Sequence, residues 1–195
     1  MIKGQDLIPF REQIFDKRPP DALPPDWNDL VYLFDHIENR LYDGFHILEF
    51  GSGCSTVIIG SLINLCTSWN NIKFNSLESD IYWYDEMILK EGWIIDYNVW
   101  HSPVERIYKH NTWCFRYTNR PVIPVDFIYL DGPELTDQIK VTYDPIDYEP
   151  LFRKGFTMIV DGRHETVEFL RKHLKRDYIV RNIDGIDSTL FELND

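Results

Sequence analysis

The chain has 195 residues, a length that suits one domain with a sizeable core. Hydrophobic residues make up 44% of it, and the formal net charge of −12 provides no attraction to nucleic acid or to an anionic membrane. No apolar run approaches membrane-spanning length, and the N-terminus lacks an apolar signal core. The three cysteines form no CxxC pair, which predicts neither a disulfide framework nor a zinc site. We therefore expect a cytoplasmic protein with no membrane and no nucleic-acid partner.

The N-terminal part divides into an arm and the start of a domain. Residues 1–25 are expected to form an arm that ends in a proline-rich linker, and residues 26–195 a single domain. A helix is expected to open that domain, because Asp26 suits an N-cap and apolar residues from Trp27 to Leu41 recur at helical spacing. Asp43 and Gly44 are typical of its end.

The segment His-Ile-Leu-Glu-Phe-Gly-Ser-Gly at 46–53 predicts a strand followed by a glycine turn, with a helix after it. Glycine lets the backbone approach a ligand closely, and the helix N-terminus offers free N–H groups. Two nucleotide motifs fit poorly. No lysine follows Gly53 as in a P-loop, and Thr56 stands where a dinucleotide fingerprint has a third glycine or alanine. A strand–turn–helix junction without a ligand is the alternative.

Further strands and helices alternate along the rest of the chain. Strands are expected at 72–77, 93–99, 125–130 and 156–160, and helices near 82–90 and 166–175. An aromatic stretch at 103–124 has no regular pattern. Strands at 178–181 and 189–193 are joined by a short link and should be antiparallel neighbours. The fold class is therefore α/β, a doubly wound, mostly parallel seven-stranded sheet with a C-terminal antiparallel β-hairpin and helices on both faces.

Four of the expected strands end in an acid: Glu49, Glu78, Asp131 and Asp161. Ligands of open α/β sheets lie beyond these carboxyl ends. Glu78, at the end of the second strand, suits the two hydroxyls of a ribose, as in NAD-binding domains. Acids are also common in turns and caps, so one of them alone would not indicate a site.

These segments together resemble the class I S-adenosylmethionine-dependent methyltransferases of the small stand-alone type. The motifs are Ile-Leu-Glu-Phe-Gly-Ser-Gly-x-Ser-Thr at 47–56, Asp-Phe-Ile-Tyr-Leu-Asp-Gly-Pro at 126–133 and Ile-Val-Asp-Gly-Arg at 159–163, and the resemblance covers about residues 30–193. A terminal β-hairpin distinguishes this fold from dehydrogenase-type Rossmann domains. The resemblance implies S-adenosylmethionine as cofactor, bound by Glu49, Gly51, Ser52, Gly53, Ser55, Thr56, Glu78, Ser79, His101, Ser102 and Asp131.

The acceptor of the implied methyl transfer is not identified by any motif. The Asn/Asp-Pro-Pro-aromatic signature of adenine and glutamine N-methyltransferases is missing, and Asp-Gly-Pro at 131–133 stands in its place. We expect a small molecule with an oxygen or nitrogen nucleophile. A hydroxyl would need a general base, for which Asp131, Asp161 and His164 are candidates by location. The aromatic residues of 108–117 either wall the acceptor pocket or pack on the core.

A metal cofactor is not expected. Some related O-methyltransferases bind a divalent cation through acids after the fourth and fifth strands, where Asp131 and Asp161 stand here. The next ligand of that family is Asn, and Gly162 replaces it, which leaves few oxygen ligands. Two other functions remain open. One is a catalytically silent, methyltransferase-like binding or accessory protein, and the other is an oxidoreductase with a nucleoside cofactor, which Thr56 and the terminal hairpin disfavour.

Overall fold

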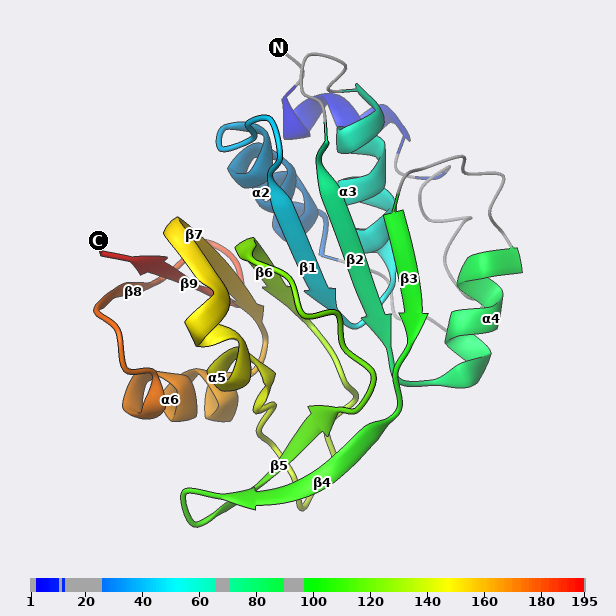
Figure 1. Cartoon of the computed structure of the whole chain (residues 1–195). Helices are drawn as coiled ribbons and strands as arrows, with labels where there is room; N and C mark the ends of the chain where they lie inside the picture. The colour runs from blue at the N-terminus through cyan, green and yellow to red at the C-terminus, as the bar shows by residue number, and fades with distance from the viewer. Residues whose placement is uncertain (1–2, 11, 13–25, 66–70, 90–96, 195) are drawn as a thin grey trace.

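The computed structural model describes residues 3–10, 12, 26–65, 71–89 and 97–194. A seven-stranded sheet with the order β3-β2-β1-β6-β7-β9-β8 forms its centre (Figure 1). The first five of these strands run parallel, and β9 is antiparallel to both β7 and β8. The strands are β1 (His46–Phe50), β2 (Lys73–Glu78), β3 (Tyr97–His101), β6 (Val125–Leu130), β7 (Phe152–Asp161), β8 (Tyr178–Asn182) and β9 (Ser188–Leu193). The predicted mostly parallel sheet with a C-terminal antiparallel hairpin is confirmed.

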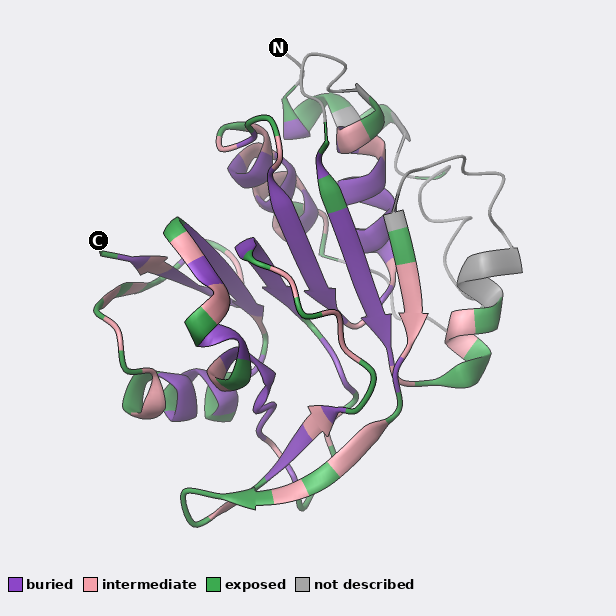
Figure 2. Cartoon of the chain, viewed as in Figure 1, coloured by how far each residue is buried: buried purple, intermediate pink, exposed green. Residues whose placement is uncertain are grey.

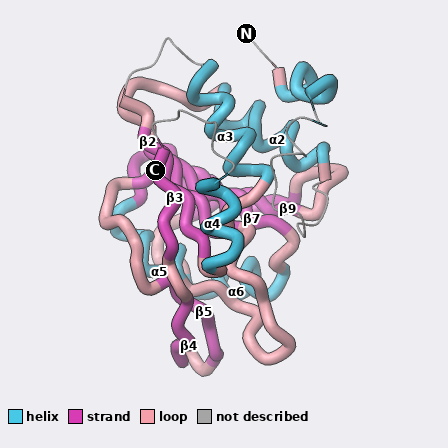
Figure 3. The backbone as a smooth tube through the Cα atoms, turned by 90° about the vertical axis from the view of Figure 1, so that its right-hand side faces the viewer, coloured by secondary structure: helices cyan, strands magenta, loops and turns pink. Residues whose placement is uncertain are grey.

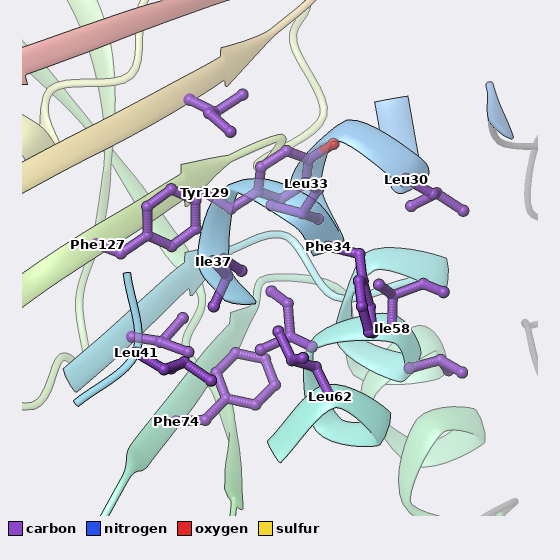
Figure 4. Packing of buried hydrophobic residues seen from close by; sticks show 14 of the residues in the cluster. Leu30, Leu33, Phe34, Ile37, Leu41, Ile58, Leu62, Phe74, Phe127 and Tyr129 are labelled. Atoms are coloured by element: carbon purple, nitrogen blue, oxygen red, sulfur yellow. The ribbon is translucent and has the colours of Figure 1, made fainter. Parts of the chain in front are cut away.

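Helices pack on both faces of the sheet, as predicted. They are the 3₁₀-helices η1 (Gly4–Phe10) and η2 (Glu149–Leu151) and the α-helices α2 (Trp27–Glu38), α3 (Cys54–Leu65), α4 (Ile81–Leu89), α5 (Asp144–Tyr148) and α6 (His164–His173). Successive strand residues point to opposite faces. Phe127 therefore packs with α2 and α3 (Figure 4), while Ile128 packs with α6 on the other face. The central strands are buried almost throughout (Figure 2).

The first helix begins where the sequence predicts and ends earlier. Asp26 is its N-cap, since its carboxylate accepts a hydrogen bond of 2.8 Å from the Asn28 N–H. The predicted end at 43–44 is wrong, because the helix closes at Glu38 with the Asn39 amide bonded to the Asp35 carbonyl. The Gly4 N–H donates to the Asp35 carboxylate, so the N-terminal segment lies against this helix. The proline-rich linker lies outside the described residues.

The aromatic stretch after the third strand forms an antiparallel hairpin, β4 (Val104–Lys109) and β5 (Thr112–Tyr117), where no regular structure was predicted. This hairpin extends away from the main sheet (Figure 3). Its turn is His110-Asn111, both with positive φ, at 49° and 61°. Asn tolerates this conformation, but the usual Asn-Gly or Asp-Gly signal of a tight turn is absent, which explains why the pattern was missed.

Three further elements differ from the predicted bounds by two residues or more. The third strand begins at Tyr97 and includes His101, while residues 93–96 of the predicted strand lie outside the described part. The fifth predicted strand is longer than expected and begins at Phe152. Helix α6 begins at His164, directly after Arg163. These shifts leave Glu78 and Asp161 as the last residues of β2 and β7, and Asp131 directly after β6.

Candidate functional site

A cavity of about 700 Å³ lies at the carboxyl ends of the parallel strands. Chain segments that follow β1, β2, β6 and β7 meet there with the first turn of α2 (Figure 1). The residues of the predicted site that line it are Gly51, Ser52, Gly53, Ser55, Glu78, Ser79, Asp131 and Asp161. The sheet thus brings together residues that lie up to 110 positions apart in the sequence. This is where ligands bind in open α/β sheets.

Gly51 and Gly53 both lie in the turn after β1, but the structural reason for a glycine differs between the two positions. Gly51 has φ +93°, and a Cβ there would lie 2.6 Å from the backbone nitrogen of Gly132. The fold itself therefore demands glycine at this position. Gly53 has no such φ, and a Cβ there would meet no described atom within 4 Å. Gly53 lines the cavity, so the free space beside it is available to a ligand.

Glu78 joins the glycine turn to the start of α4. Its Oε2 accepts hydrogen bonds from the Ser52 N–H at 3.1 Å and the Ser52 hydroxyl at 2.7 Å. Its Oε1 accepts from the Asp80 N–H at 2.9 Å. Oε1 also accepts a long hydrogen bond of 3.5 Å from the Ser79 hydroxyl. The carboxylate is buried and lines the cavity, so a ligand hydroxyl could take the place of this long bond.

Glu49 and Thr56 lie beneath the turn and do not line the cavity. Glu49 is fully buried, and its Oε2 accepts 2.6 Å hydrogen bonds from the hydroxyls of Thr56 and Ser76. The Thr56 hydroxyl oxygen accepts from the Gly53 N–H at 2.9 Å. These hydrogen bonds stabilise the conformation of the glycine turn beside the cavity. Thr56 stands where a dinucleotide fingerprint has glycine or alanine. Here its hydroxyl stabilises the glycine turn by hydrogen bonds to Gly53 and Glu49.

The opposite wall of the cavity is acidic. Asp131 and Asp161 lie there with Asp29, from the first turn of α2. The Asp161 carboxylate accepts from the Tyr129 hydroxyl at 2.8 Å and from the Ser188 hydroxyl at 3.0 Å. The Asp131 side chain is 51% exposed. Its pKa is nevertheless raised to about 7, because desolvation by the surrounding protein and the charges of Asp161 and Asp29 together outweigh the lowering by Arg163. A carboxyl with a pKa near neutrality suits proton transfer.

Arg163 is buried between the ends of β6 and β7. Its guanidinium donates to the carbonyls of Pro133 and Asp131, and one nitrogen lies 3.8 Å from the Asp131 carboxylate. Through these hydrogen bonds Arg163, at the start of α6, fixes the position of the loop after β6. Arg163 and Asp29 could not be assigned to the site from the sequence, because only the fold shows that these positions line the cavity.

Other predicted residues lie elsewhere. His101 is part of β3, with its ring 5.5 Å from the Tyr84 ring, and the buried Ser102 hydroxyl accepts from the Asn119 N–H. His164 is exposed, lies 3.4 Å from the Asp187 carboxylate and lines a second cavity, between the β4–β5 turn and α6. In the aromatic stretch, Phe115 and Tyr117 are buried, and Tyr108 and Trp113 form an exposed pair at the hairpin tip.

The free energy of unfolding is expected to fall as pH rises from about 5 to about 8. Burial raises the pKa of Glu49 from 4.5 to about 7 and that of Asp29 from 3.8 to about 6. In this pH range the folded state keeps protons that the unfolded chain has released, so raising the pH removes stability. Chemical denaturation at both pH values measures the change, and Glu49→Gln should reduce it. An equal or larger free energy of unfolding at the higher pH would contradict this account.

The described residues contain no group of three or more His, Cys, Asp and Glu side chains placed to hold a metal ion. Within the same residues, none of the helices has both the length and the apolar character needed to cross a membrane.

Comparison with known proteins identifies relatives in structure and none in sequence. No protein-family model and no curated protein matches the chain. A methyltransferase from Geobacter sulfurreducens superposes with a TM-score of 0.59 at 10% identity, covering 99% of this chain and 92% of that one. A methyltransferase of Podospora anserina, solved with SAH (S-adenosylhomocysteine) bound, gives 0.59 at 12% identity, covering 100% and 89%.

A third structure agrees with these two. The precorrin-6y C5,15-methyltransferase of Geobacter metallireducens gives a TM-score of 0.55 at 14% identity, covering 91% of this chain and 93% of that one. Identities this low establish the fold alone. The strand order, the terminal antiparallel strand and these superpositions show that the chain has the Rossmann-like fold of the class I S-adenosylmethionine-dependent methyltransferases.

Proposed function

We propose that this protein is an enzyme that binds S-adenosylmethionine in the cavity and transfers its methyl group to the oxygen or nitrogen of a small-molecule acceptor. The observation that carries the proposal is the glycine turn beside Glu78. Gly53 leaves open space that nothing in the described chain requires, and Glu78 turns a buried carboxylate toward that space. A nucleoside with two ribose hydroxyls fits both features. The SAH-bound methyltransferase of Podospora anserina, which has the same fold, supports this choice of ligand.

In this proposal, one group of cavity residues binds the cofactor and another acts on the acceptor. The residues that would hold the cofactor are Gly51, Ser52, Gly53 and Glu78, with the α3 N-terminus behind the turn. When bound, the cofactor supplies a methyl carbon whose bond to sulfur breaks with both electrons passing to sulfur. Asp131 would take up the proton of an acceptor that has one to lose, which would leave the acceptor a lone pair for the methyl group. Orientation of the acceptor in line with the methyl group accounts for much of the rate.

Glu78→Ala is expected to weaken binding of S-adenosylmethionine and of S-adenosylhomocysteine by about 5- to 150-fold. This range corresponds to the ~1–3 kcal/mol lost when hydroxyl partners of a charged acceptor go unpaired. Calorimetric titration measures the affinity, and circular dichroism confirms that the variant is folded. Asp43→Ala is a matched control, because Asp43 is exposed and precedes β1 at the opposite edge of the sheet. Unchanged affinity in Glu78→Ala would remove this residue from the site.

Methyl transfer is expected to survive chelation of divalent metal. Gly162 stands where the metal-dependent relatives of the family carry a ligand, and Asp161 already accepts bonds from two hydroxyls. The assay compares initial rates with and without a chelator. A rate that is abolished by the chelator and restored by magnesium would instead make Asp131 and Asp161 metal ligands.

A turnover assay distinguishes an enzyme from a silent binding domain. Labelled S-adenosylmethionine is incubated with the protein and pooled metabolites, and transfer of the label is followed. Label in a small molecule supports the proposal. Tight cofactor binding with no labelled product in any pool would favour a binding or accessory protein.

A further inference from the structure

Arg163 is the one cation among the described residues that line the cavity, and it has a firm backbone anchor. It is the N-cap residue of α6, and its carbonyl accepts a hydrogen bond of 2.9 Å from the Val167 N–H. The first turn of the helix therefore fixes the backbone from which the side chain extends. Because this side chain is buried, the guanidinium is held in one place beside the loop after β6.

The guanidinium uses two of its nitrogens to hold that loop. Nη1 donates to the Pro133 carbonyl at 2.7 Å, and Nη2 donates to the Asp131 carbonyl. A planar guanidinium presents several N–H groups in a fixed arrangement, so one side chain can span carbonyls that lie two residues apart. A lysine ammonium is a compact charge on a flexible stem and lacks this geometry. Arg163 therefore fixes the backbone that carries the Asp131 carboxylate.

The Asp131 carboxylate lies close to Arg163 without a hydrogen bond to it. Nη2 is 3.8 Å from Oδ1, beyond hydrogen-bond distance, and no described residue donates a hydrogen bond to this carboxylate. A bidentate arginine–carboxylate pair would occupy the lone pairs with which a base accepts a proton. Here the half-exposed carboxylate keeps these lone pairs open to the cavity, while the positive charge is near enough to act on it.

The charge of Arg163 opposes several other influences on Asp131. Desolvation raises the pKa of this carboxyl, as do the charges of the neighbouring acids Asp161, Asp29 and Glu78. Arg163 lowers the same pKa, and its effect is the largest among the neighbouring charges. Without the guanidinium, the carboxyl would keep its proton to higher pH, and a protonated carboxyl accepts no proton from a substrate.

We propose that Arg163 is a positioning residue of the methyl-transfer reaction and acts through Asp131, because it holds the loop of this carboxylate and places a positive charge beside it. The inference rests on the proposed function, in which Asp131 is the base. Asp161, on the same wall, accepts hydrogen bonds from two hydroxyls, so its lone pairs are partly taken. Asp131 combines open lone pairs with a nearby cation, and Arg163 supplies that cation.

The test measures the ionisation of Asp131 directly, by carboxyl-carbon NMR of isotope-labelled protein over a pH range. Asp131→Asn identifies the resonance. Arg163→Lys and Arg163→Met are matched variants, because both lose the guanidinium and only Lys keeps the charge. We expect the midpoint of the Asp131 titration to lie at least about 0.7 pH units higher in Arg163→Met than in Arg163→Lys. This is the effect of a unit charge about 4 Å away in a solvent-exposed setting.

Two controls separate the local charge from other effects. Arg171→Met removes the same charge from the same helix, at a residue that pairs with Glu168 at 3.3 Å and is not among the described residues lining the cavity. It should leave the Asp131 midpoint unchanged. If circular dichroism shows that Arg163→Met is unfolded, Arg163→Gln takes its place, because its amide still donates to the loop carbonyls and has no charge.

Equal midpoints in Arg163→Lys and Arg163→Met would show that the guanidinium only supports the loop, and would overturn the inference. A shift of the same size in Arg171→Met would also overturn it. The titration needs no ligand, so it is read separately from calorimetric binding of S-adenosylhomocysteine. If the parent protein does not bind S-adenosylhomocysteine, the proposed function fails and this inference fails with it. Binding of S-adenosylhomocysteine together with equal midpoints refutes this inference alone.

Discussion

Gly51→Ala is expected to lower the free energy of unfolding by more than about 2 kcal/mol. A side chain at φ +93° strains the backbone by about 1–3 kcal/mol. The added Cβ would also meet the backbone of the Asp131–Gly132 segment, which cannot move aside as a flexible side chain does, and overpacking of this kind adds about 1–3 kcal/mol. Chemical denaturation of the purified variant measures the loss. A variant as stable as the parent protein would show that the turn and the loop after β6 are not in contact.

Gly53→Ala is the matched variant, two residues away in the same turn. It should keep the parent protein's stability, because the new Cβ meets no described atom within 4 Å and the position does not have a left-handed φ. It should nevertheless weaken S-adenosylhomocysteine binding, because the methyl group enters the space assigned to the ligand. Unchanged affinity with unchanged stability would place the cofactor away from Gly53.

Asp131→Asn is expected to lower the rate of methyl transfer to a hydroxyl acceptor, which must lose its proton, by about 10²–10⁴-fold, the usual contribution of a positioned base. Cofactor affinity should change little. The activity of the parent protein should rise with pH as the Asp131 carboxyl loses its proton, because only the ionised form accepts a proton. This rise should lie above the pH range of an ordinary aspartate, since desolvation and the neighbouring acids raise the pKa of Asp131. Single-turnover rates and cofactor titrations of the same variant separate the two effects.

Two further variants show whether another group is the base. Asp161→Asn should act mainly on acceptor binding, and His164→Gln should have little effect, because His164 lines the other cavity. A loss of rate in His164→Gln that matches the loss expected for Asp131→Asn would contradict this assignment. If Asp131→Asn loses cofactor affinity and rate together, Asp131 is a cofactor contact.

Much of the fold could be predicted because local patterns specify it. The apolar runs of β1, β2 and β6 each end in an acid or a glycine turn, and the helical segments between strands require parallel pairing. The short link between β8 and β9 predicts their antiparallel pairing. The acids Glu78, Asp131 and Asp161 follow from the same patterns, since parallel strands place their carboxyl ends at one edge of the sheet.

The features of the fold and the site that could not be predicted depend mostly on contacts between distant segments of the chain. Asp29 is an ordinary first-turn acid of α2 in the sequence, and only its approach to Ser188, 159 positions away, brings it into the cavity wall. Glu49 looks like a cofactor ligand in the motif, but it is buried beneath the turn that it supports. The β4–β5 hairpin escaped prediction because its turn lacks glycine and its strands have no clean alternation of polar and apolar residues.

Calorimetric titration of the parent protein with S-adenosylhomocysteine, beside an identical titration with NAD, tests the central claim most directly. The structure predicts saturable binding of S-adenosylhomocysteine at one site per chain, lost or weakened in Glu78→Ala, and no binding of NAD. Binding of NAD with no response to S-adenosylhomocysteine would contradict the account and return the glycine turn to the oxidoreductase interpretation.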